Sequence, residues 1–236
     1  MNKVFVVLGL MCVMCTIPAA APAALTERNE HVFFTATEHQ LLPTPEQVFD
    51  AEFEKVYNEF TEAVRRKDLS VIDRFINDST KSSLEDYGKS AFYDYWNLHN
   101  DPDQSGLWAE MEEIIELGGT YKPEWECFIA PYTFNDWPDE FDVFEYYVVI
   151  DKEVKVYEEE DLSSNVVDYL NYNIMKFHDN NKDNFESHDL VRIKTPSGTY
   201  GYIQKLYIRS PRDYAITIRR NDIGEWKIQF FLQPCC

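Results

Sequence analysis

In the first half of the chain, apolar residues recur at steps of three and four, which is the period of an amphipathic helix. The longest stripe lies within 45–67, where Thr44 stands at the expected N-cap position. Asp68 or Ser70 is the expected cap of the next helix, and Gly118 marks a helix end. The predicted helices cover residues 45–67, 68–76, 82–96 and 107–117, and an interruption of the third is expected near Gly88.

From Phe144 onward the period changes to two, which predicts β-strands. The segment Pro196-Ser-Gly198 separates two of these strands as in a hairpin, and Asn221–Gly224 joins the last two. With one earlier strand, the predicted strands cover residues 127–130, 147–150, 154–156, 166–170, 190–194, 200–203, 214–220 and 225–232. Helices followed by strands indicate the α+β fold class.

Three strand segments carry a recognisable pattern: Val154-Lys-Val156, Asp189–Ile193 and Ser197–Ile203. Together they resemble the bacterial SH3-like (SH3b) domain, and the last segment matches its closing signature. In that signature, Gly201 is the residue without a side chain that lets two strands approach. The resemblance implies an SH3-like β-barrel, a module that binds ligands and rarely catalyses.

The chain departs from this family pattern at two places. Tyr157 stands where an arginine is usual, and Glu158–Asp161 replaces a Ser-Gly-Pro-Ser loop that often borders the ligand groove. The family's ligand specificity therefore does not transfer to this chain. The whole chain looks like exported bacterial proteins that place a helical domain before the barrel, a resemblance that supplies an architecture only.

These observations divide the chain into four parts. We predict a mainly α-helical domain, then an SH3-like β-barrel, then a C-terminal β-hairpin that packs on the domains. The boundaries are 1–23 for a signal peptide, 24–145 for the helical domain, 146–209 for the barrel and 210–236 for the hairpin.

Residues 1–23 have the pattern of a secretory signal. Lys3 precedes an apolar run from Val4 to Ile17, and small residues at Ala21 and Ala23 favour cleavage after Ala23. We therefore expect a periplasmic or secreted protein with no stable membrane insertion after cleavage. A membrane anchor and a lipoprotein signal remain as alternatives.

The formal net charge of −20 limits the kinds of partner that the chain is expected to bind. Nucleic acids and anionic lipid surfaces repel so acidic a chain, so neither is expected to bind. A cationic protein is a compatible partner. The simpler interpretation is that acidity keeps an exported protein soluble.

Three cysteines follow the signal, namely Cys127, Cys235 and Cys236. One bridge from Cys127 to the C-terminal pair is conceivable in an oxidising compartment. We favour a buried or incidental thiol at Cys127 and a redox-sensitive tail.

Tyrosines of the strand-rich half are the best candidates for ligand contact, because aromatic grooves of SH3-like domains hold extended peptides. The alternative is that some of them fill the core of a small barrel. The candidate ligand-binding residues are Tyr157, Tyr200, Tyr202 and Tyr207.

We expect no metal, no cofactor and no catalytic residue. Asp179, Asn181 and Asp183 follow the start of an EF-hand loop, but Asn184 and Leu190 stand where glycine and glutamate are required. A solvated loop explains this segment better.

The leading hypothesis is an exported, non-enzymatic protein that binds a cell-wall peptide or a protein segment through an SH3-like barrel. One alternative is an acidic inhibitor or immunity protein that neutralises a cationic exported enzyme, with salt-sensitive association. Another is a hydrolase with a site between its domains.

Overall fold

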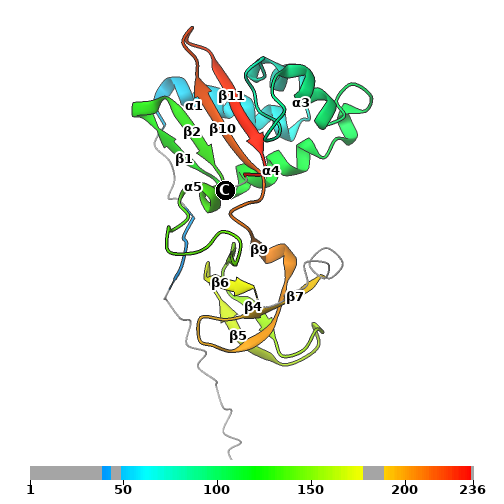
Figure 1. The fold of residues 1–236 in the computed structure, drawn as a ribbon, viewed down its shortest axis with the longest axis vertical. Helices are drawn as coiled ribbons and strands as arrows, with labels where there is room; N and C mark the ends of the chain where they lie inside the picture. Colours follow the sequence, from blue (N-terminus) through cyan, green and yellow to red (C-terminus); the bar gives the residue numbers. More distant parts are fainter. Residues whose placement is uncertain (1–38, 44–48, 178–188, 235–236) are drawn as a thin grey trace, which may run out of the picture. The chain divides into compact units, whose positions relative to one another are not determined.

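The computed structural model describes residues 39–43, 49–177 and 189–234 (Figure 1). It mixes helix and sheet, with the helices toward the N-terminus and a strand-rich C-terminal region. This agrees with the α+β class expected from the change of period. The helices are α1 Ala51–Arg65, α2 Leu69–Ile72, α3 Lys89–Tyr95, α4 Leu107–Leu117 and α5 Tyr132–Asn135, with 3₁₀ turns η1 Asp73–Phe75, η2 Pro102–Gln104, η3 Pro123–Trp125 and η4 Lys205–Tyr207.

Helix α1 begins later than the sequence predicts. Its N-cap is Asp50, whose carboxylate accepts hydrogen bonds from the backbone N–H of Glu52 at 3.0 Å and of Phe53 at 2.8 Å. The cap predicted at Thr44 lies outside the described residues. Asp68 caps α2 as expected, because its carboxylate accepts from the N–H groups of Ser70 and Val71.

The first sheet has the strand order β1-β2-β10-β11, and every neighbouring pair is antiparallel. The C-terminal hairpin, expected to pack on the domains, supplies two of its four strands, and β10 pairs with β2. The strands are β1 Thr120–Lys122, β2 Cys127–Ala130, β10 Ala215–Arg220 and β11 Trp226–Leu232.

Helices α1 to α4 pack against one face of this sheet (Figure 1). Phe128, Ile218 and Ile228 are neighbours in register on that face, and all are buried. Phe53 and Phe60 of α1 pack into the same cluster. Each such side chain contributes about 1.5–3 kcal/mol through its burial, which is why the amphipathic stripe predicts α1 well.

The second sheet has seven strands in the order β5-β4-β8-β7-β6-β3-β9, and all of its pairings are antiparallel. Its inward residues include Val156, Val191, Ile193 and Ile203, which form a separate apolar cluster. The strands are β3 Tyr146–Val149, β4 Val154–Tyr157, β5 Val166–Leu170, β6 Ile174–Phe177, β7 Leu190–Lys194, β8 Tyr200–Gln204 and β9 Ile208–Arg209.

The predicted hairpin between β7 and β8 is confirmed. The N–H of Thr195 donates to the carbonyl of Thr199 at 2.8 Å, and Gly198 takes a positive φ of 87°. Glycine adopts this conformation without steric cost, so the local sequence is sufficient to fix the turn.

Candidate functional site

Two of the four candidate tyrosines share one face of the hairpin formed by β7 and β8. Arg192 pairs with Tyr202, and Lys194 pairs with Tyr200, so these four side chains alternate with the inward core residues. Tyr157 of β4 lies opposite Tyr202 on its other side. We call the surface made by Tyr157, Tyr200, Tyr202, Arg192 and Lys194 the tyrosine face.

The members of the tyrosine face differ in exposure. Tyr200 is 45% exposed, and the Arg192 guanidinium and the Lys194 ammonium each lie 5.6 Å from its ring centroid. Tyr157 is only 8% exposed, although it belongs to none of the three apolar clusters. Tyr200 and Tyr202 can therefore offer ring surface to a ligand, whereas Tyr157 is too buried to do so.

Tyr207 has different surroundings. It lies in η4 and packs against the apolar cluster of the second sheet, and its carbonyl accepts from the N–H of Ile150 at 2.9 Å. Tyr207 therefore fits the alternative interpretation, in which some of the tyrosines fill the core.

A hollow of about 1000 Å³, which we call the acidic pocket, lies beside the end of the tyrosine face. Leu190 and Gln204 line it, and they are the next pair on the same face of the hairpin after Arg192 and Tyr202. The carboxylates that line it are Glu113, Glu160, Asp161, Asp189 and Asp213.

Apolar side chains also line the acidic pocket. Leu162 is 52% exposed and Leu206 is 64% exposed. Lys205 is the only cationic residue among the described residues that line it. The acidic pocket is suited to a ligand that carries both an amine or guanidinium group and apolar surface.

A buried arginine borders the acidic pocket. Arg209 of β9 is 2% exposed, and its guanidinium donates to the carboxylate of Glu113 and to the carbonyl of Tyr214 at 2.9 Å. Asp213 accepts from the N–H of Ser210 at 2.9 Å. Burial raises the pKa of the Asp213 carboxyl, although the positive charge of Arg209 acts in the opposite direction.

Sequence reasoning found one part of this arrangement and missed the rest. The acidic loop Glu158–Asp161 is visible as a departure from the family pattern, and two of its residues line the acidic pocket. Leu206 and Asp213 carry no local signal, because they reach the acidic pocket only through the folding of the segment after β8.

Within residues 39–43, 49–177 and 189–234, no group of three or more His, Cys, Asp or Glu side chains has a geometry that could hold a metal ion. The EF-hand-like segment that begins at Asp179 lies mostly outside the described residues. Among the described helices, none is long and apolar enough to cross a membrane.

Comparison with known proteins adds no relative. The chain matches no family model, no curated protein and no solved structure.

Proposed function

We propose that this chain is a non-enzymatic binding protein of the cell envelope, in which residues 146–209 form an SH3-like barrel that holds a peptide segment. The close packing around Gly201 is an argument for the proposed barrel. A Cβ atom there would lie 2.6 Å from Cγ1 of Val156 and 2.7 Å from the carbonyl oxygen of Tyr157. Only glycine permits this approach of β8 to β4, as the family signature requires.

The acidic pocket is the observation that carries the binding proposal. An extended peptide along β7 and β8 would first meet the rings of Tyr200 and Tyr202. It would then reach the exposed leucines and carboxylates of the acidic pocket. We propose that its ligand is a cell-wall peptide or a protein segment with amine-bearing and apolar side chains.

A second candidate function is neutralisation of a cationic exported enzyme. The formal charge of −20 and the five carboxylates of the acidic pocket favour it. Opposite charge accelerates association with such an enzyme, and salt weakens the attraction because mobile ions screen exposed charges.

Retention experiments at low and high salt separate the two candidates. The mature protein would be incubated with purified peptidoglycan and, separately, with an envelope extract. Retention on peptidoglycan that resists salt supports the wall peptide as ligand. Capture of a basic protein that is lost at high salt supports the inhibitor. Absence of binding to both would reject a binding function.

A matched pair of variants tests the acidic pocket itself. Leu206→Ala removes an exposed side chain from the acidic pocket, and Ile223→Ala removes a 79% exposed side chain from the distant hairpin turn. We expect Leu206→Ala to weaken retention about fivefold and Ile223→Ala to leave it unchanged. Equal retention by the two variants would exclude the acidic pocket as the site.

A further inference from the structure

A second hollow lies in the first sheet, at the turn of the C-terminal hairpin, and its charge is opposite to that of the acidic pocket. Its volume is about 360 Å³, and Arg219, Lys227 and Asp222 line it. Asn77 and Ser79 line it from the segment after η1. We call it the basic hollow.

Two cations face each other here. Arg219 of β10 is directly opposite Lys227 of β11, and like charges in that relation destabilise a strand pair. The Lys227 ammonium is partly compensated, since it donates to the carbonyl of Arg74 at 2.7 Å and lies 3.2 Å from the Glu225 carboxylate.

Arg219 has no such compensation. Its side chain is exposed, and it makes no hydrogen bond or ion pair with any residue in the described part of the chain. The chain has 42 acidic and 22 basic residues, so acidic partners are in excess. An arginine that still lacks one is free to pair with an anion from outside.

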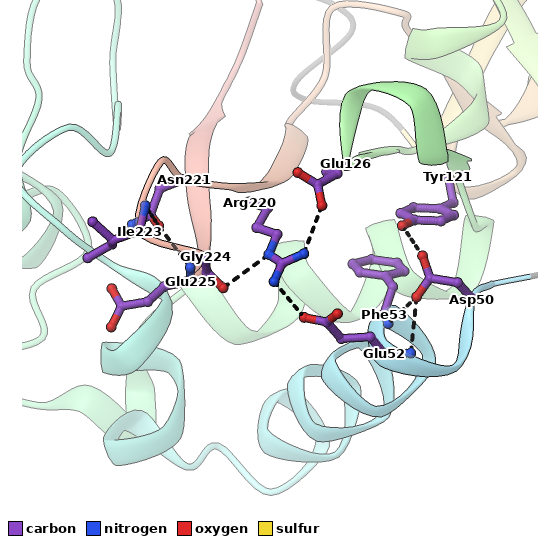
Figure 2. A network of polar contacts seen from close by, with 10 residues as sticks. All are labelled: Asp50, Glu52, Phe53, Tyr121, Glu126, Arg220, Asn221, Ile223, Gly224 and Glu225. Carbon is purple, nitrogen blue, oxygen red and sulfur yellow. Dashed lines mark hydrogen bonds and ion pairs between the residues drawn. The ribbon is translucent and has the colours of Figure 1, made fainter.

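A network of polar contacts holds the wall of the basic hollow (Figure 2). Arg220 donates to Glu126 at 2.8 Å and to the carbonyl of Gly224 at 3.2 Å, and it lies 3.3 Å from Glu52. The side-chain oxygen of Asn221 accepts from the N–H of Glu225 at 2.8 Å. A turn fixed at these points loses little entropy when a ligand binds.

Neutral donors complete the basic hollow. The side-chain oxygen of Asn77 accepts from the N–H of Ser79 at 2.8 Å. Within residues 39–43, 49–177 and 189–234, the side-chain amide N–H groups of Asn77 and the hydroxyl of Ser79 have no acceptor. They are available to a ligand oxygen.

We propose that the basic hollow binds the oxyanion of a small ligand, either a carboxylate or a phosphate group. Arg219 supplies the ion pair, since its planar fork matches two oxygens of one group. Asn77, Ser79 and Lys227 supply hydrogen bonds. Asp222 would accept a hydrogen bond from an amine or hydroxyl on the same ligand.

The test uses inorganic phosphate and acetate, titrated separately into the isotope-labelled full chain at constant ionic strength set with chloride. Backbone amide signals of residues 77–79 and 221–224 are followed by NMR. We expect saturable shifts with one of the two anions. Saturation by phosphate alone assigns a phosphate ligand, and saturation by acetate assigns a carboxylate ligand.

Three variants make the test specific. Arg219→Gln is expected to weaken the binding at least about tenfold, and Arg219→Lys by less, because it keeps the charge but loses the fork. Arg66→Gln removes an arginine at the C-cap of α1, whose side chain is 73% exposed, and should leave the anion affinity unchanged. Shifts that never saturate with either anion, or equal affinity in Arg219→Gln and Arg66→Gln, would overturn the proposal.

Discussion

Tyr157 of β4 lies directly opposite Tyr202 of β8, and the two side chains share one face of the second sheet although only Tyr202 is partly exposed. Substitution of Tyr202 therefore tests binding more directly than substitution of Tyr157. Tyr157→Ala would leave a cavity and cost about 3 kcal/mol of stability, which would obscure any effect on binding.

Removal of an exposed ring is the cleaner test of the tyrosine face. We predict that Tyr200→Ala and Tyr202→Ala each weaken ligand retention about fivefold or more, because each removes stacking surface at the proposed groove. Thermal unfolding of the Tyr200→Ala variant should stay close to that of the unaltered chain. Tyr87→Ala is the matched control. Tyr87 is 68% exposed and lies in the segment before α3, outside the second sheet.

The ion pair of Arg209 predicts a contrast between two neighbouring glutamates. Glu113→Ala leaves the buried Arg209 guanidinium without its carboxylate, and we expect a loss of about 1–3 kcal/mol in the free energy of unfolding. The lower half of this range is expected, because the Glu113 side chain is 47% exposed and solvent screens it. Urea denaturation measures the loss.

Glu112 provides the control for that measurement. It lies next to Glu113 on α4, is exposed, and makes no ion pair with a described residue. Glu112→Ala should change stability by less than about 0.5 kcal/mol. Equal effects of the two substitutions would show that the Arg209 pair contributes nothing to stability.

Cys127 is predicted to resist alkylation in the native protein. It is buried in β2, and burial raises the pKa of its thiol, so the reactive thiolate is scarce at neutral pH. Iodoacetamide should therefore label Cys127 only after the protein is unfolded in urea. Peptide mapping by mass spectrometry identifies the labelled residue.

The same experiment tests the bridge that the sequence left open. Cys127 lies opposite Arg219, whereas Leu232, near the tail, lies opposite Ala215 at the other end of β10. Cys127 is a free, buried thiol in the described part of the chain. Recovery of a single alkylatable thiol, located in the tail and not at Cys127, in urea without reductant would establish the bridge instead.

Asp50 links helix capping to pH. Hydrogen bonds from the N–H of Phe53 and from the hydroxyl of Tyr121 hold the pKa of Asp50 below its usual range (Figure 2). Its stabilising contribution is thus complete above the unfolded-state pKa and is lost as the pH falls through the lower folded-state pKa. Asp50→Ala should lower the melting temperature at neutral pH by a few degrees.

Asp50→Asn separates the cap from the charge. Asparagine still accepts at the N-cap, so this variant should melt close to the unaltered chain at neutral pH. The difference in melting temperature between the unaltered chain and Asp50→Ala should shrink on acidification. A constant difference down to the lowest pH at which the chain folds would refute the link.

The local sequence predicts elements accurately where one face is buried. Helix α4 and strands β2, β5 and β7 have the bounds that the period predicted. Helix α3 is shorter than predicted, because Gly88 has a φ of 98° and interrupts the helical segment before it. The sequence predicts an interruption near Gly88, but the period by itself does not show that the residues before it leave the helix.

By itself, the sequence determined the α+β order of elements, the hairpin turns at Gly198 and Gly224, and the acidity of the chain. The tertiary structure alone decided that β10 pairs with β2, that Tyr157 is buried while Tyr200 is exposed, and that the Arg219 side chain has no hydrogen-bond or ion-pair partner among the residues that the structure describes. The reason is physical: periodicity fixes which face of a strand is apolar, whereas pairing between distant segments depends on the packing of the whole core.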